Sequence, residues 1–361
     1  ASGYLLGGTQ ARSVADWEKT LRQFTAACPH MQLQHLHELD WATSCTRLCA
    51  HQQPPALATP VRYDGQFDRH WGVASFSALT RAMPVASDAV LLAAGQADDE
   101  VLPSDDGLTP AAGHPATSAS QAVWHRFGRG PLVGNFLHDQ LQWLGEAGFV
   151  LDAPQQERLR RRCQRAGYDE TATEDVLQWL SAIVQHPLPV LEARLPEIDT
   201  ALPEMEFWLP LAQLPAAQVD ALCRQHILPG MERPPLPQRQ LHGMLMGFAD
   251  LVFAHRGRYW VLDYKSNHLG PDASAYDAPA LQQAMLAHRY DVQAALYLLA
   301  LHRLLHARLG AAYRPEAQLG GALYFFLRGL DGSTGGMHHI AAPLPLLDAL
   351  HALITTPAEA A

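Results

Sequence analysis

The stretch Gly247–Asn267 reads G-F-A-D-L-V-F-A-H-R-G-R-Y-W-V-L-D-Y-K-S-N and carries the clearest structural pattern in the chain. Two apolar, β-prone runs, Phe248–Ala254 and Arg258–Tyr264, flank a short polar turn that contains Gly257. Runs of this kind joined by a short turn with glycine are typical of a β-hairpin. We therefore expect two adjacent antiparallel strands here.

Two carboxylates and a lysine interrupt these apolar runs. Asp250 lies in the first strand, and Asp263 and Lys265 lie two residues apart near the end of the second. Alternate residues of a strand share a face, so Asp263 and Lys265 project from the same side. A buried acid is costly unless it is paired or binds a metal. The set is either a metal site with a cation, suited to phosphodiester cleavage, or a buried Asp–Lys pair that braces the hairpin.

The scarcity of lysine favours the first interpretation. The chain has 26 Lys and Arg residues, and only Lys19 and Lys265 are lysines. Arginine supplies the positive charge almost everywhere else. A lysine ammonium is a compact point charge that can orient a water molecule or contact a phosphate oxygen. A lysine retained beside two strand acids therefore indicates a chemical role.

Composition limits the class of protein. With 361 residues, 48% hydrophobic and 17% charged, the chain can form one large domain or two smaller ones. It has no apolar run near the roughly 18 residues of a membrane span and no signal-peptide pattern. It lacks an initiator Met, so we expect an internal fragment, and five cysteines without a secretory signal favour the cytosol. The net charge of −10 argues against a general nucleic-acid coat but is compatible with an acidic nuclease site.

Composition also divides the chain into regions. Val14–Phe24 has the apolar spacing of a helix, and residues 1 to about 60 are expected to be mostly helical. Residues 95–120 are rich in Ala, Asp, Ser, Thr, Gly and Pro, which predicts a flexible linker. We expect residues 1–94 to precede this linker and residues 121–361 to form the following domain.

Helices are expected after the linker. One opens at Gly134, and His138 lies in its first turn beside an apolar face, where a lone histidine is usually a core or boundary residue. Further helices are expected at Glu170–Val184 and Leu188–Arg194. The densest basic cluster precedes Glu170 and contains Arg158, Arg160, Arg161, Arg162 and Arg165. This cluster is either a solvated helix face or a stripe that contacts phosphates.

A further strand is expected at Glu204–Leu209, with Glu204 and Glu206 on one face. This strand either lies next to the hairpin, which would bring one glutamate close to the acids, or is an ordinary half-exposed strand. After the hairpin, Ala280–Leu309 is predicted to be one long helical stretch. Gln293 and Tyr297 share a face of it and could reach a phosphate, a base or the lysine.

The last strand is expected at Gly320–Leu327, which is apolar throughout and therefore predicted to be buried. The second half of the chain then contains a helix, a strand, the hairpin, a helix and a strand. This order predicts a small α/β sandwich with its acids clustered at the middle strands.

Four segments carry a family resemblance: G-F-A-D-L-V-F, L-D-Y-K-S-N-H-L-G, R-Y-D-V-Q-A-A-L-Y and G-G-A-L-Y-F-F-L-R-G. Together they resemble the C-terminal nuclease domain of the RecB family, from RecBCD-type helicase–nucleases (exodeoxyribonuclease V). That domain belongs to the PD-(D/E)XK nuclease superfamily, so the resemblance implies a restriction-endonuclease-like αβββαβ core with added helices. It covers residue 120 to the end, and W-G-V-A-S-F-S-A-L-T-R resembles the exit from the helicase region. Residues 1–94 would then be a mostly helical remnant of that region.

The resemblance also implies roles for individual residues. Asp250 and Asp263 would bind the metal, and Lys265 would be the catalytic lysine of the D-x-K motif. This sequence has Asp before x-K, as the RecB family does, where many superfamily members have Glu. The G-N-F-L-H-D segment makes His138 a metal ligand in this branch, and the backbone carbonyl of Tyr264 would complete the coordination.

Other implied roles concern the second glutamate strand and the long helix. The E-M-E-F segment supplies the family's remaining acid, for which we favour Glu204 over Glu206. Gln293 and Tyr297 match a Q-x-x-x-Y helix that contacts DNA or braces the site. Arg158, Arg161 and Arg162 are candidate DNA contacts.

The implied reaction is hydrolysis of DNA, mainly single-stranded or unwound, in double-strand-break repair and recombination in the bacterial cytoplasm. The expected ion is Mg²⁺ or Mn²⁺, whereas Ca²⁺ would bind but support catalysis poorly. The chain has no G-x-x-x-x-G-K-[ST] motif, so no ATP site is expected in it. RecC-type and RecD-type subunits are the implied partners. The alternative is a nuclease-silent interaction module that recruits RecA or contacts partner subunits, although such a module would usually have lost an acid or the lysine.

Overall fold

The computed structural model describes residues 14–26, 30, 71–80 and 122–355, and the proposed linker at 95–120 lies outside these ranges. The chain forms two compact units, residues 1–66 and 67–361. In the first unit, helix α2 (Val14–Ala26) confirms the helix expected there and carries an Arg22–Glu18 ion pair on its surface. The second unit contains the elements that position the site.

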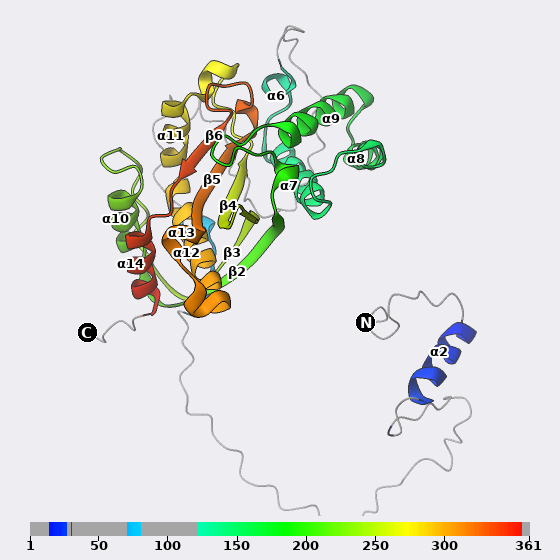
Figure 1. Ribbon diagram of the computed structural model, residues 1–361, viewed down its shortest axis with the longest axis horizontal. Helices are drawn as coiled ribbons and strands as arrows, with labels where there is room; N and C mark the ends of the chain where they lie inside the picture. The colour runs from blue at the N-terminus through cyan, green and yellow to red at the C-terminus, as the bar shows by residue number, and fades with distance from the viewer. Residues whose placement is uncertain (1–13, 27–29, 31–70, 81–121, 356–361) are drawn as a thin grey trace, which may run out of the picture. The chain divides into compact units, whose positions relative to one another are not determined.

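A six-stranded mixed sheet organises the second unit (Figure 1). β3 pairs with β2 along one edge, and on its other edge it pairs with β4 near one end and with β1 near the other. β4 is parallel to β5, and β5 is antiparallel to β6. The strands are β1 (Gly72–Ala74), β2 (Thr200–Pro215), β3 (Gln240–His255), β4 (Arg258–Lys265), β5 (Leu319–Phe326) and β6 (Met337–Ile340).

Helices cover both faces of the sheet. Figure 1 shows α10 and α14 on one side and α7, α8 and α9 on the other. Longer helices are α7 (Pro131–Glu146), α8 (Ala153–Arg165), α9 (Glu170–Gln185), α10 (Ala216–His226), α11 (Ala278–Ala287), α12 (Tyr290–Leu309) and α14 (Leu344–Thr355). Short helices are α4 (Phe76–Thr80), α6 (Val123–Arg126) and α13 (Pro315–Gln318), with 3₁₀ turns at Leu195–Glu197, Ala273–Tyr276, Gly310–Ala312 and Leu327–Gly329. The order α7, β2, β3, β4, α12, β5 is the expected αβββαβ core.

Two apolar cores fill the space between the sheet and these helices. One core joins the sheet to α10, α12 and α14 and includes Val219, Leu299 and Leu347. The other joins the opposite face to α7, α8 and α9 and includes Leu141, Leu159 and Trp179. β4 and β5 are therefore covered on both sides, which agrees with their nearly continuous apolar sequences.

The predicted hairpin is confirmed, and β3 is longer than expected because it starts at Gln240. β2 likewise continues through Pro210 and ends at Pro215. β1 belongs to the region assigned to residues 1–94, yet it pairs with β3 in the sheet. The sheet of the second unit therefore takes in a strand that precedes the proposed linker.

Three of the predicted helices differ from the structure. α7 begins at Pro131 rather than Gly134, because a proline at the first helical position has a suitable φ and needs no amide partner. His138 therefore lies in the second turn of α7. Leu188–Arg194 is a turn, closed by the Leu188 amide donating to the Ala193 carbonyl at 2.8 Å, since prolines on either side of Leu188 disfavour a helix. The long helix at Ala280–Leu309 is divided into α11 and α12 at Arg289, which has a φ of 57°.

Gly320 in β5 illustrates how tightly the sheet is packed. A Cβ atom at this position would lie 2.3 Å from the Trp260 ring, which is itself buried. We expect Gly320→Ala to lower the free energy of unfolding by about 1–3 kcal/mol, as overpacking of a core does. Urea denaturation measures the change, with Gly128→Ala as the control, because its Cβ would meet only a Val133 methyl at 3.6 Å. Equal stability of the two variants would contradict the prediction.

Candidate active site

The candidate site lies where β3 and β4 separate. The last paired residues of the hairpin are Leu251 and Leu262, so Asp250 and Asp263 are the next pair in register. From there β3 continues beside β2 and β1, while β4 continues beside β5. The two carboxylates therefore lie at the point where the strands diverge, a feature that the sequence analysis did not predict.

Asp250 is fixed by contacts from two elements. Its Oδ2 accepts a hydrogen bond of 2.8 Å from the Tyr264 amide and lies 3.3 Å from Nδ1 of His138 on α7. Burial acts to raise the pKa of Asp250, but His138, Lys265 and the Tyr264 amide together hold it below its usual value. Asp250 is therefore an ionised carboxylate, and His138 is at the site and not merely a core residue.

Asp263 and Lys265 form a buried ion pair. Nζ of Lys265 lies 2.8 Å from Oδ2 of Asp263, and the two residues are only 6% and 2% exposed. Burial raises the pKa of the Asp263 carboxyl to about 7, and the charge of Asp250 adds to this although Lys265 opposes it. Two acids and one lysine therefore lie close together, so the acids outnumber the lysine at this site.

The two glutamates of β2 have different surroundings. Glu204 falls between the pairs Pro203–Leu251 and Met205–Ala249, so its register position is opposite Asp250. It is partly buried and has a φ of 50°, a costly conformation for a residue other than glycine that recurs at functional sites. Glu206 is paired with Phe248, is exposed, and accepts a hydrogen bond of 2.9 Å from Trp208 Nε1. β2 is thus the strand next to the hairpin, and its position 204 is the one adjacent to the acids.

Gln293 and Tyr297 lie inside the protein. They are 1% and 2% exposed, and Gln293 Nε2 donates to the Tyr297 hydroxyl at 3.0 Å. The Tyr324 hydroxyl donates to Gln293 Oε1 at 3.2 Å, and Tyr324 is the register partner of Asp263 on β5. This burial favours the bracing alternative over direct contact with DNA.

The arginines of α8 make contacts mainly within the helical layer. The Arg162 guanidinium donates to Gln140 and lies 5.1 Å above the Trp143 ring. Arg161 pairs with Glu157 at 3.1 Å on the surface, and Arg158 Nη1 donates to Gln155 at 3.4 Å. Arg162 therefore joins α8 to α7, while Arg158 and Arg161 are exposed on the outer face of α8.

Tyr290 and Asn267 were missed by the sequence analysis. Nζ of Lys265 lies 3.9 Å from the centroid of the Tyr290 ring, and the Tyr290 hydroxyl donates to Asn267 Oδ1 at 3.3 Å. Tyr290 precedes Gln293 by three residues, so the helical spacing that identified Gln293 and Tyr297 also extends to it. Asn267 lies two residues beyond Lys265, with which β4 ends.

The side chains of the site are chemically suited to a metal ion, although they are not arranged around one. Among the described residues, no three His, Cys, Asp or Glu side chains are placed to hold a metal ion as they stand. Asp250 faces His138 and Asp263 faces Lys265, so the carboxylates are engaged in ion pairs. Two carboxylates with an imidazole nevertheless suit a hard divalent cation, whose charge would offset the burial and the charge of Asp250 that together raise the pKa of Asp263. The chemistry of these donors therefore fits a divalent cation.

An αβββαβ core with acids on two diverging strands and a D-x-K lysine defines the class of PD-(D/E)XK nucleases. The sequence pattern of the PD-(D/E)XK nuclease superfamily matches residues 120–360, and the chain belongs to this superfamily, whose members generally use divalent metal ions. Within the described part of the chain, no helix is both long and apolar enough to cross a bilayer.

More particularly, the chain is similar to RecBCD enzyme subunit RecB from several bacteria, which confirms the resemblance to the RecB nuclease domain. It is 40% identical over 210 residues to that of Escherichia coli (strain K12), covering 57% of this chain and 17% of that protein. It is 35% identical over 210 residues to RecB of Haemophilus influenzae, covering 56% of this chain and 17% of that protein. It is 45% identical over 100 residues to RecB of Mycobacterium tuberculosis (strain ATCC 25618 / H37Rv), covering 27% of this chain and 9% of that protein. The chain thus matches less than a fifth of the length of these relatives.

Proposed function

We propose that the chain is a Mg²⁺-dependent DNA nuclease domain of a RecBCD-type helicase–nuclease. The observation that carries the proposal is the pair of opposed carboxylates, Asp250 and Asp263, beside the buried ammonium of Lys265. A structural ion pair needs only one acid for one lysine. The second acid and the adjacent His138 give the site an excess of ligands that a divalent cation would use.

Each site residue has a proposed role. His138, Asp250, Asp263 and the backbone carbonyl of Tyr264 hold Mg²⁺, with Mn²⁺ as a substitute and Ca²⁺ as a poor one. When bound, the ion polarises the scissile phosphate and lowers the pKa of a coordinated water. Lys265 orients the attacking water or neutralises the negative charge that develops on the phosphate.

The remaining candidates act around this centre. Glu204, opposite Asp250 in register, is the further acid of the site. Gln293 and Tyr297 brace it through Tyr324. We also propose that three arginines of α8 contact DNA phosphates: Arg158 and Arg161, which are exposed, and Arg162 at the inner edge of the helix. Their attraction to the phosphates would weaken as the salt concentration rises.

The proposed substrate is single-stranded or unwound DNA, cut in an exo- or endonucleolytic manner. RecB is named as a subunit of the RecBCD enzyme, and we propose that this chain likewise works with RecC-type and RecD-type subunits in the bacterial cytoplasm. The competing function is an interaction module for RecA that no longer cuts DNA. The retained acids and lysine favour the nuclease.

Digestion of linear single-stranded DNA by the purified chain tests this function. We expect cleavage with Mg²⁺, loss of cleavage with EDTA, and recovery when Mg²⁺ is restored. Asp263→Ala is the matched variant and should stay inactive at every Mg²⁺ concentration. A folded wild type that cuts neither with Mg²⁺ nor with Mn²⁺ would sink the nuclease proposal in favour of the interaction module.

The metal site can be tested separately through His138. We expect His138→Ala to weaken Mn²⁺ binding by roughly 10-fold or more, because an imidazole that contacts Asp250 is removed from the ligand set. Isothermal titration calorimetry measures the change. His351→Ala is the control, since His351 is exposed on α14 at the opposite face of the sheet. Unchanged Mn²⁺ affinity in the His138 variant would remove this residue from the proposed ligands.

A further inference from the structure

We propose that the ring of Tyr290 is a positioning element that holds the ammonium of Lys265 in place for catalysis. This inference rests on the proposed nuclease function. The ammonium lies between a carboxylate and an aromatic face: Asp263 Oδ2 is 2.8 Å away, and the centroid of the Tyr290 ring is 3.9 Å away. The Tyr324 ring follows at 5.8 Å. A cation within about 6 Å of a ring centroid is attracted by the negative face of the ring, and more strongly when water is excluded.

The Tyr290 ring is itself held rigidly. It is 4% exposed and stacks with two other rings, His288 at 5.2 Å and Tyr324 at 5.8 Å between ring centroids. Its hydroxyl donates to Asn267 Oδ1, and its backbone carbonyl accepts a hydrogen bond of 3.1 Å from the Tyr324 hydroxyl. The ring that faces Lys265 is therefore held both at its hydroxyl and at the backbone of Tyr290.

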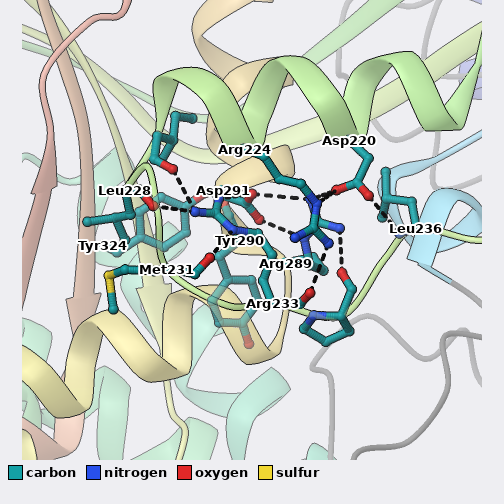
Figure 2. A network of polar contacts seen from close by, with 12 residues as sticks. Asp220, Arg224, Leu228, Met231, Arg233, Leu236, Arg289, Tyr290, Asp291 and Tyr324 are labelled. Carbon is teal, nitrogen blue, oxygen red and sulfur yellow. Dashed lines mark hydrogen bonds and ion pairs between the residues drawn. The ribbon is translucent and has the colours of Figure 1, made fainter.

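The backbone of Tyr290 is fixed by a buried network of arginines and aspartates, shown with Tyr290 and Tyr324 in Figure 2. Tyr290 is the first residue of α12 and lies between Arg289 and Asp291. Arg289 pairs with Asp291 at 3.0 Å and with Asp220 of α10 at 2.7 Å. Asp291 also pairs with Arg233, in the segment that follows α10, at 2.8 Å. The start of α12 is thus held by ion pairs on both sides of Tyr290, and the pair through Arg289 reaches α10 itself.

The need for such a surface follows from the chemistry of Asp263. This carboxylate is a proposed metal ligand, so it cannot serve Lys265 alone. A lysine side chain is long and flexible, and an ammonium that is free to move is a poor stabiliser of one phosphate oxygen. The Tyr290 ring carries no net charge and takes no part in the proposed metal coordination. Its hold on the ammonium therefore does not depend on whether the metal is bound.

Substitutions at position 290 separate this role from simple packing. Tyr290→Phe keeps the ring and loses only the hydroxyl, so we expect kcat to stay within about 3-fold of wild type. Tyr290→Leu keeps an apolar side chain without a π face, and kcat should fall by about 10-fold with little change in KM or in Mn²⁺ affinity. Replacing the residue with phenylalanines that carry one, two and three fluorines should lower kcat in steps, because each fluorine weakens the negative ring face.

A second readout does not depend on cleavage. Because Lys19 and Lys265 are the only lysines, isotopically labelled lysine gives two side-chain signals in NMR spectra, and Lys19 serves as the internal reference. The ε-methylene protons of Lys265 should show a ring-current shift in wild type and in Tyr290→Phe that is lost in Tyr290→Leu.

The outcomes distinguish the two proposals. Cleavage that is insensitive to fluorination, or equal kcat in the Phe and Leu variants, overturns the role of Tyr290 and leaves the nuclease function standing. A wild type that shows the ring-current shift but cuts no DNA overturns the nuclease function and, with it, any catalytic use of the contact. A graded fall of kcat together with the ring-current shift supports both.

Discussion

Lys265→Met is expected to lower the rate of DNA cleavage by at least about 10²–10³-fold at saturating Mg²⁺, which is the effect of removing one preorganised group that stabilises charge in a transition state. Methionine keeps an unbranched stem of similar volume and removes only the ammonium, so the packing against Tyr290 should survive. The acids and His138 remain in place, and metal binding should therefore remain detectable. The rate, and not the metal occupancy, should account for the loss.

The chain supplies a matched control for this experiment. Lys19→Met removes the other lysine, which is exposed on α2 in the first compact unit, and should leave cleavage unchanged. Cleavage is measured on labelled single-stranded DNA, with Mn²⁺ calorimetry on both variants. A Lys265→Met protein that cuts at the wild-type rate would show that the lysine only neutralises Asp263, which is the bracing alternative raised by the sequence.

The sequence was sufficient to predict the hairpin and its acids because both depend on local signals. Two β-prone runs around a glycine turn predict strand pairing, and acids inside such runs need a partner whatever the surrounding fold. The register that places Asp250 opposite Asp263 follows from the turn itself. The mutual position of these two acids was therefore accessible before any tertiary contact was known.

The break between α11 and α12 was not accessible in this way. The sequence around Arg289 has no proline or glycine, and the apolar helical pattern continues through it. The left-handed conformation of Arg289 accompanies contacts with Asp220, Asp291 and the Pro234 carbonyl, two of which lie more than 50 residues away. A local pattern cannot show such partners. For the same reason the sequence analysis found Gln293 and Tyr297 but not the aromatic contact of Lys265.

The second large effect is expected from this network. Asp291→Ala should lower the free energy of unfolding by about 3–5 kcal/mol, the usual cost of removing one partner from a buried ion pair. Asp291 is fully buried and pairs with Arg233 at 2.8 Å and with Arg289 at 3.0 Å (Figure 2). Its removal leaves two buried guanidinium groups with only Asp220 as a nearby carboxylate of the network. Chemical denaturation of the purified chain measures the change.

The charge and the shape of Asp291 can be separated by further variants. Asp291→Asn keeps the size of the side chain, so a loss similar to that of Asp291→Ala would assign the effect to the missing charge. Arg233→Met combined with Asp291→Leu removes both partners of a buried ion pair. This double variant should be less destabilising than Asp291→Ala alone, because no uncompensated charge is left at that pair.

Glu157→Ala is the control, because it breaks the exposed pair with Arg161. It should change the free energy of unfolding little, since surface pairs are screened by water. If Asp291→Ala were as mild as Glu157→Ala, the network could not be what fixes the start of α12. The rigidity inferred for Tyr290 would then have to come from its stacked rings and its hydrogen bonds with Asn267 and Tyr324.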